Sequence, residues 1–185
     1  MKDQESLRRL LLERSVQRGD FTLASGRRSS YYIDCRPTTM SAEGLVLIGR
    51  MGWAAIQAAD WRPAAVGGLT MGADPVAYAI AAASFTSDNP VDAFSVRKRT
   101  KDHGTGRLIE GNFRSGNAVV VIEDVITSGE SATQAIATVE QAGGLVLGVL
   151  AVVDRQEGGR RTLEARGCRV LTLTTVGELG LEGIG

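Results

Sequence analysis

The stretch VVVIEDVITSGES, residues 119–131, decides the fold of this chain. It joins an apolar run to two adjacent carboxylates, Glu123 and Asp124, and then to a loop of Thr, Ser and Gly. A short apolar run rich in Val and Ile is typical of a strand that is buried on both faces. A loop of this kind at the start of a helix often holds an anion, because its N–H groups and the helix dipole favour negative charge. The two negative side chains beside such a loop therefore need a chemical explanation.

The loop itself has two interpretations. Thr127 and Glu130 have the T-x-x-E spacing of a plain capping box at a helix start. Alternatively, the loop binds a phosphate group, which Gly129 permits because it lacks the Cβ that would block a close approach. The acidic pair favours the second interpretation, because charges at the end of a buried strand need a partner.

A phosphorylated sugar would reconcile the loop with the acidic pair. Its phosphate would lie on the loop, while its ribose hydroxyls donate hydrogen bonds to Glu123 and Asp124, each contributing about 1.5–3 kcal/mol. Neighbouring side chains on a strand point to opposite faces. Both carboxylates can therefore face one ligand only if the chain has already turned at this point.

Along the rest of the chain, apolar strands alternate with helices. We expect strands over residues 64–70, 91–96, 118–122, 145–153 and 170–176, helices over 6–16, 42–59, 76–85 and 132–142, and extended chain around a Gly turn over 21–34. This order predicts an α/β fold with a mostly parallel twisted sheet flanked by helices. Ligands of such sheets bind beyond the carboxyl ends of the strands. Four polar segments that follow strands are therefore expected to meet at one edge, namely residues 70–74, 97–104, 123–129 and 154–157.

The bulk composition is that of an ordinary globular protein. The 185 residues suit a single domain, 1–185, with 43% hydrophobic and 23% charged residues and a formal net charge of zero. The neutral balance and the 5% aromatic content argue against a nucleic-acid binder. Two distant cysteines, a charged N-terminus without an apolar signal core, and no apolar run long enough for a bilayer lead us to expect a cytoplasmic protein with no membrane association.

The segment RKRTKDHG, residues 97–104, concentrates positive charge. It holds five potential cations, which are Arg97, Lys98, Arg99, Lys101 and His103, the only histidine of the chain. A solvated basic loop is the simpler interpretation. The chemical alternative is that preorganised cations stabilise the negative charge of a departing pyrophosphate.

These segments resemble a known family. The stretch 119–131 resembles the signature of type I phosphoribosyltransferases, which bind phosphoribosyl pyrophosphate (PRPP), and RKRTKDHG resembles the mobile loop of orotate phosphoribosyltransferases. The resemblance implies the type I phosphoribosyltransferase fold, with about residues 1–36 contributing to a small N-terminal hood over the base site. It also implies transfer of the phosphoribosyl group from PRPP to orotate in pyrimidine synthesis, with Mg²⁺ as cofactor. It further implies a homodimer in which the loop of Arg97 reaches the neighbouring site.

The same resemblance assigns the site residues. Lys101, His103 and Asp124 would be catalytic, and the PRPP contacts would be Arg97, Lys98, Lys101, His103, Glu123, Asp124, Val125, Ile126, Thr127, Ser128, Gly129, Glu130 and Ser131. Thr127 and Arg155 would bind orotate, with Tyr32 and Ile33 near the base, and no side chain is assigned to the metal. Many relatives carry Lys at the position of Ala24 and near Met71.

Arg155 is the residue that indicates which base accepts the phosphoribosyl group. Its planar guanidinium fits the carboxylate of orotate, which a purine lacks. Read alone, it is equally a surface arginine paired with Asp154 or Glu157. Two other functions stay open: a phosphoribosyltransferase for another base, and a non-catalytic PRPP-sensing regulator on the same fold.

Overall fold

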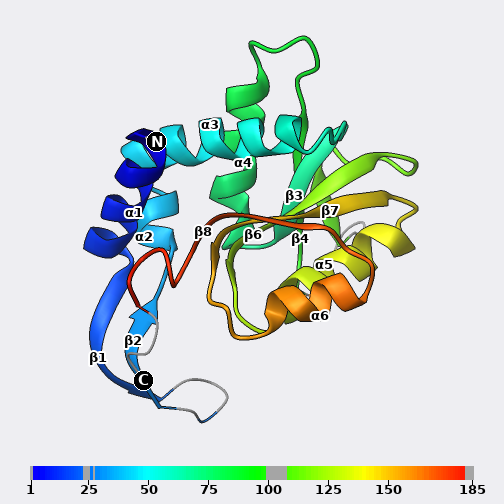
Figure 1. The fold of residues 1–185 in the computed structure, drawn as a ribbon. Coiled ribbons are helices and arrows are strands. Elements are labelled where there is room, and N and C mark those ends of the chain that lie inside the picture. The colour runs from blue at the N-terminus through cyan, green and yellow to red at the C-terminus, as the bar shows by residue number, and fades with distance from the viewer. Residues whose placement is uncertain (1, 23–25, 27, 99–107, 182–185) are drawn as a thin grey trace.

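The computed structural model describes residues 2–22, 26, 28–98 and 108–181, and its centre is a six-stranded sheet (Figure 1). The strand order is β5-β4-β3-β6-β7-β8. The strands are β3 (Ala65–Leu69), β4 (Asp92–Val96), β5 (Ile109–Gly111), β6 (Ala118–Ile126), β7 (Leu145–Asp154) and β8 (Val170–Thr175). Only β5 runs antiparallel to its neighbour, so the expected mostly parallel α/β sheet is confirmed.

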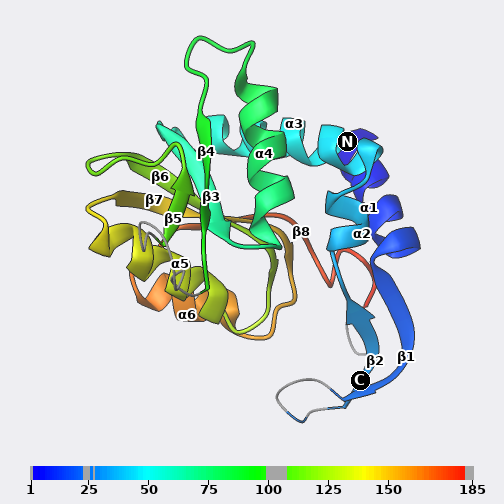
Figure 2. The ribbon, with the colours of Figure 1, turned by 180° about the vertical axis from the view of Figure 1, so that it is seen from behind.

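Helices cover both faces of the sheet (Figures 1 and 2). Helices α3 (Ala42–Ala58) and α4 (Ala73–Ser84) lie on one face, with α1 (Lys2–Arg14) and the short α2 (Arg36–Thr39) beside α3. Helices α5 (Glu130–Gln141) and α6 (Gly159–Ala165) lie on the other face. Strand β6 shows why two cores form, because Val120 and Ile122 pack toward α3 and α4 whereas Val119 and Val121 pack toward α5.

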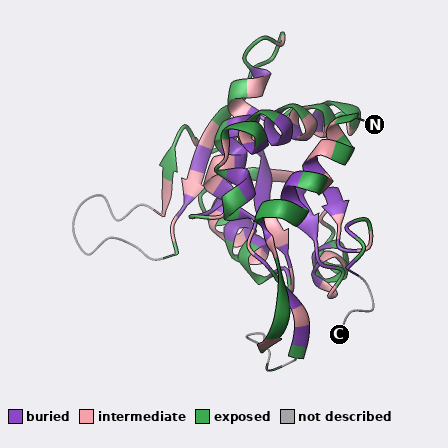
Figure 3. Cartoon of the chain, turned by 90° about the vertical axis from the view of Figure 1, so that its left-hand side faces the viewer, coloured by how far each residue is buried: buried purple, intermediate pink, exposed green. Residues whose placement is uncertain are grey.

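A separate two-stranded sheet projects from the rest of the chain (Figure 3). It consists of β1 (Val16–Thr22) and β2 (Arg28–Ile33), which pair in antiparallel fashion. The expected helix over 6–16 therefore runs too far, since α1 ends at Arg14 and Val16 already pairs with Ile33. Ser29, Tyr31 and Ile33 are buried, while most of β1 is exposed.

Two elements around the quoted stretch differ from expectation. Strand β6 does not stop at Ile122 but runs to Ile126, because Val125 and Ile126 still pair with β7. Helix α5 begins at Glu130, two residues before the expected start. The short elements α2, β5 and α6 were not expected, since three to seven residues carry too little periodicity to be recognised. Within the described residues, no helix is long and apolar enough to cross a membrane.

The strand order fixes where a ligand can bind. From β3 the chain passes through α4 to β4 on one side, whereas β6 lies on the other side of β3 and leads on to β7. The connections therefore leave the carboxyl ends of β3 and β6 in opposite directions. This is the topological switch point at which open α/β sheets leave a crevice.

The core of β7 gives a matched stability test. Leu150 is completely buried, whereas Leu145 on the same strand is 62% exposed. We expect Leu150→Ala to lower the free energy of unfolding by about 2–5 kcal/mol through lost burial and a residual cavity. Leu145→Ala should change it by less than about 0.5 kcal/mol. Urea denaturation followed by circular dichroism measures both, and equal losses would contradict the described burial of β7.

Candidate active site

The loop between β6 and α5, residues 127–129, forms the floor of a small cavity. The cavity has a volume of about 190 Å³ and is lined by Glu123, Val125, Ile126, Thr127, Ser128, Gly129, Glu130, Ser131 and Ala132. The N–H groups of Ser128 and Gly129 donate no hydrogen bond to another described residue. Free N–H groups at the start of a 12-residue helix suit an anion such as phosphate.

The capping-box interpretation of this loop is wrong. The residue at the N-cap of α5 is Gly129 rather than Thr127, and no side chain caps the helix. Gly129 has a φ of 81°, which is the left-handed region that favours glycine. The sharp turn at Gly129 ends the strand and starts the helix, and it leaves the loop N–H groups directed away from any internal acceptor among the described residues.

The acidic pair lies on β6, just before this loop. Because β6 stays paired through Ile126, the chain has not turned at Glu123, and the two carboxylates face opposite sides of the strand. Glu123 lines the cavity of the loop. Asp124 lies against the β3–α4 connection, where a Cβ added to Gly72 would come within 2.6 Å of its Oδ1. The pair therefore straddles β6 at the switch point.

Burial dominates the electrostatics of both acids. Glu123 is 6% exposed, and burial together with the charge of Asp124 raises its pKa to about 8, an effect that nearby Lys98 opposes. Its Oε1 has no hydrogen-bond partner among the described residues. Burial also raises the pKa of Asp124, against the lowering effect of hydrogen bonds from backbone N–H groups, one of which is donated by Val125 at 2.9 Å. Burial therefore disfavours the charged form of both groups, and a bound cation or hydrogen-bond donor would offset this cost.

The connection after β3 is held in place by Asp74, at the start of α4. Its carboxylate accepts hydrogen bonds from Thr70 Oγ1 at 2.6 Å and from Ser95 Oγ at 2.7 Å. These bonds tie the end of β3 to β4 and so fix Gly72 beside Asp124. Met71, on the same connection, is 58% exposed at the edge of the sheet.

The end of β4 carries the start of the basic segment. The Nε of Arg97 donates to Glu110 Oε1 on β5 at 3.0 Å. Lys98 is exposed, and its positive charge opposes the rise in the pKa of Glu123. Lys101 and His103 lie outside the described residues, as does Ala24.

The end of β7 carries Arg155, which lies next to the β6–α5 loop. Its backbone N–H donates to the carbonyl of Ile126 at 3.0 Å. The residue is only 6% exposed, and its guanidinium lies 5.3 Å from the centre of the Tyr31 ring on β2. Its Nη2 lies 2.8 Å from Glu157 Oε1, while its Nε has no hydrogen-bond partner among the described residues.

The alternative interpretation was a surface arginine paired with Asp154 or Glu157. Arg155 is buried, so the predicted exposure is wrong, but the predicted pairing with Glu157 is confirmed. Glu157 forms the ion pair, whereas Asp154 accepts a hydrogen bond from the N–H of Gln156 at 2.8 Å. The aromatic contact comes from Tyr31 and not from its neighbour Tyr32, which is 40% exposed. Strand alternation counted from the apolar Ile33 would have indicated Tyr31 as the inward-facing tyrosine.

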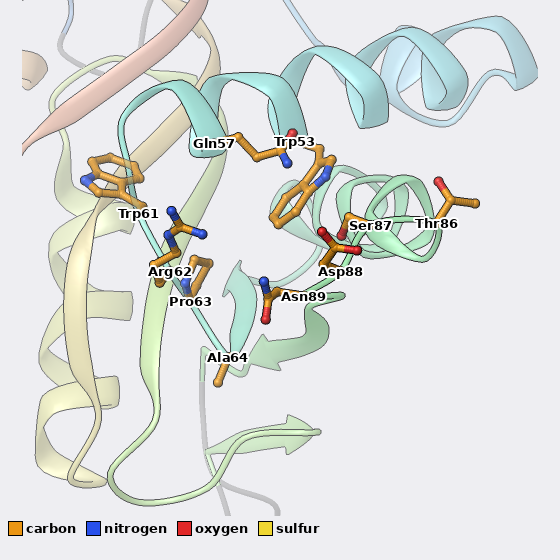
Figure 4. A pocket seen from close by; sticks show the side chains of 10 residues that line it. All are labelled: Trp53, Gln57, Trp61, Arg62, Pro63, Ala64, Thr86, Ser87, Asp88 and Asn89. Carbon is orange, nitrogen blue, oxygen red and sulfur yellow. The ribbon is translucent and has the colours of Figure 1, made fainter.

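A larger cavity of about 750 Å³ lies elsewhere and lacks comparable chemistry (Figure 4). Its lining includes Trp53, Trp61 and Arg62, together with Pro63 and Ala64, which precede β3. It therefore opens near the amino ends of the strands, away from the switch point. Arg62 is already paired with Asp60 at 2.9 Å. Across the described ranges, no group of three or more His, Cys, Asp or Glu side chains is arranged to hold a metal ion.

Comparison with known proteins agrees with this geometry. No protein-family model matches the chain. It is 44% identical to the orotate phosphoribosyltransferase of Aquifex aeolicus over 182 residues, covering 97% of this chain and 98% of that protein. The crystal structure of the Mycobacterium tuberculosis orotate phosphoribosyltransferase with Fe(III) dicitrate superposes with a TM-score of 0.85 at 44% identity, covering 97% and 99% of the two chains. The complex of the Mycobacterium tuberculosis enzyme with PRPP gives a TM-score of 0.81 at 41% identity over 97% and 99%.

The parallel sheet, the acid pair at its switch point and the loop that follows define the class of type I phosphoribosyltransferases. Within that class, the near-complete coverage by close relatives is decisive. The chain belongs to the orotate phosphoribosyltransferase family.

The raised pKa of Glu123 makes stability depend on pH. The pKa rises from an ordinary 4.5 to about 8, so the folded chain holds this proton more tightly than the unfolded chain. The free energy of unfolding therefore falls as pH rises between these two values. We expect Glu123→Gln to gain stability relative to the parent between about pH 5 and about pH 8, by at most about 1.4 kcal/mol per pH unit.

Urea denaturation at several pH values measures this gain. Glu130→Gln, which changes an exposed carboxylate at the start of α5, is the control and should follow the parent. A constant difference between Glu123→Gln and the parent across this range would show that Glu123 titrates normally.

Proposed function

We propose that this chain transfers the 5-phosphoribosyl group of PRPP to N1 of orotate, forming orotidine 5′-phosphate and pyrophosphate, a step of pyrimidine nucleotide synthesis. Membership of the family supports the reaction. The observation that carries the choice of base is Arg155, whose buried Nε has no hydrogen-bond partner among the described residues, one strand away from the β6–α5 loop. The loop proposed to bind PRPP and the arginine proposed to bind orotate thus lie side by side.

The donor would bind along β6 and its loop. The 5′-phosphate would take the free N–H groups of Ser128 and Gly129 at the start of α5, within the segment 127–131. Because β6 has not turned at the acids, the ribose would lie across the carboxyl end of the strand, where its hydroxyls reach Glu123 from one side and Asp124 from the other. Negative charge on Asp124 near the anomeric carbon favours the positive charge that develops there when the leaving group departs. Val125 and Ile126 shape this segment through their backbone, since their side chains pack into the two cores.

The acceptor would lie between the hairpin and β7. The Nε and Nη2 groups of Arg155 form a fork that matches a carboxylate in two parallel hydrogen bonds. Tyr31 lies against the guanidinium and restricts its orientation. Uracil and the purines lack the carboxylate, so they would make no such pair of charged hydrogen bonds with Arg155. Thr127 completes the acceptor site from the β6–α5 loop.

The leaving group would be held by the basic segment after β4. Arg97 and Lys98, with Lys101 and His103, supply cations for pyrophosphate, and Lys101 and His103 act with Asp124 in the chemical step. Mg²⁺, which the family's reaction uses, would neutralise charge on the pyrophosphate. The resemblance assigns no side chain to the metal, and Mg²⁺ readily keeps its waters and binds substrate phosphate oxygens.

We propose that two copies assemble through α4, which brings the loop of Arg97 to the neighbouring site. Tyr78 on this helix and Phe85 at its end are 52% and 79% exposed, and Met71, on the connection before the helix, is 58% exposed. Tyr78 OH also lies 2.9 Å from Ser95 Oγ on β4, so the surface adjoins the strand that leads into the basic segment. This continuity supports a second copy as the occupant.

We also propose that the chain is a single domain in which residues 1–36, with the β1–β2 sheet, form the hood over the base. The contact of Tyr31 with Arg155 supports this role. The free state of Cys35 and Cys168 supports a cytoplasmic location.

Substitution of Arg155 tests the base assignment. With PRPP and Mg²⁺ present, the ultraviolet absorbance of orotate should fall, while uracil, adenine and hypoxanthine should not be consumed. Arg155→Gln should raise the KM for orotate roughly 10²-fold by removing a charged, buried hydrogen-bond donor, with little change in the KM for PRPP.

Arg62→Gln, in the remote cavity, is the control and should behave like the parent. Consumption of a purine in place of orotate would refute the base assignment. PRPP binding without turnover of any base would favour the sensing regulator.

The dimer proposal predicts that charge on α4 dissociates the assembly. Phe85→Glu should shift the sedimentation mass from two copies to one, because the interface would then bury an unpaired charge. Leu145→Glu places the same charge at a site that is 62% exposed on β7 and should leave the mass unchanged. A single-copy mass for the parent chain would exclude this interface.

A further inference from the structure

The proposed orotate site contains a carboxylate of its own. Glu157, three residues after the end of β7, places Oε1 2.8 Å from Nη2 of Arg155. Both side chains are largely buried, at 6% exposure for Arg155 and 15% for Glu157. Neither substrate contact nor catalysis by the β6–α5 loop requires a negative charge at this point.

The geometry of the pair leaves the arginine only partly satisfied. Nη2 lies close to Glu157 but makes no hydrogen bond with it, and Nε has no hydrogen-bond partner among the described residues. These two nitrogens form the edge of the guanidinium that holds a carboxylate in a bidentate manner. Both atoms are also closed to solvent. A second carboxylate can therefore reach this edge only when a neighbouring group gives way.

We infer that Glu157 is an internal competitor that holds the place of the orotate carboxylate on Arg155 and is displaced when orotate binds. This inference rests on the proposed function of the site. Glu157 balances the buried cation when orotate is absent, although Nη2 makes no hydrogen bond with it. Orotate replaces it with two aligned hydrogen bonds. The displacement also selects among bases, because a base without a carboxylate cannot replace the ion pair between Glu157 and Arg155.

Removal of the competing charge should tighten orotate binding. In Glu157→Gln the empty protein holds a buried cation without a counter-charge, so an incoming carboxylate gains more. We expect the KM for orotate to fall roughly three- to tenfold, while the KM for PRPP stays unchanged. Uracil should remain unused, because it cannot pair with Arg155. The melting temperature should drop without orotate and recover when orotate is added.

Steady-state kinetics and thermal denaturation of parent and variants test this inference. Glu164→Gln is the control, because Glu164 forms an exposed pair with Arg160 on α6 and should leave both KM values unchanged. Glu157→Asp keeps the charge but withdraws it by one methylene, and should lower the KM for orotate to a smaller extent. This second variant keeps the test valid if Glu157→Gln does not fold.

An unchanged or increased KM for orotate in both variants would overturn the inference, because Glu157 would then merely position Arg155. Failure of the parent chain to consume orotate would instead refute the proposed function itself.

Discussion

The pairing of β6 with β3 on one side and with β7 on the other is the constraint on which the site depends. The apolar residues of β6 are buried between helices on both faces, so the register of this strand is firmly set. Its carboxyl end lies where the connections of the sheet diverge. The β6–α5 loop, the β3–α4 connection and the end of β7 are therefore brought together by the sheet itself. Lys101 and His103, the remaining cations proposed for the site, lie outside the described residues.

The site keeps several buried polar groups unsatisfied. Glu123 Oε1 and Arg155 Nε have no hydrogen-bond partners among the described residues, and two loop N–H groups are also free. Each buried unsatisfied group costs about 1–3 kcal/mol in the folded state. In the proposed function, a phosphate, a set of ribose hydroxyls and a carboxylate complete the groups that lie at this site. The groups without partners among the described residues at this site thus match the chemistry of the proposed substrates.

Sequence reasoning reached the fold because strongly apolar strands and amphipathic helices determine the sheet. It also placed residues 70–74, 123–129 and 154–157 at one edge of the sheet, because the carboxyl ends of parallel strands share an edge, whereas most of residues 97–104 lies outside the described residues. The predicted end of β6 was wrong. Glu123 and Asp124 interrupt the apolar run, although the pairing with β7 continues beyond them. A strand end marked by two acids looks like a turn when hydrophobicity is the only guide.

The contacts of Arg155 show a second limit. The fork and its fit to a carboxylate follow from residue type, but burial depends on Tyr31, which arrives from a hairpin more than a hundred residues earlier in the chain. The pairing with Glu157 rather than Asp154 depends on the path of the chain after β7. These contacts depend on tertiary geometry, so no local sequence pattern predicts them.

The most direct test of the account is a crystal structure of this chain with orotidine 5′-phosphate. The account predicts the 5′-phosphate on the N–H groups of residues 127–131, the ribose hydroxyls within hydrogen-bond distance of the acids of β6, and the base carboxylate on the Nε–Nη2 edge of Arg155. A nucleotide bound in the cavity of Trp53 and Trp61, or one whose phosphate lies away from the start of α5, would contradict it.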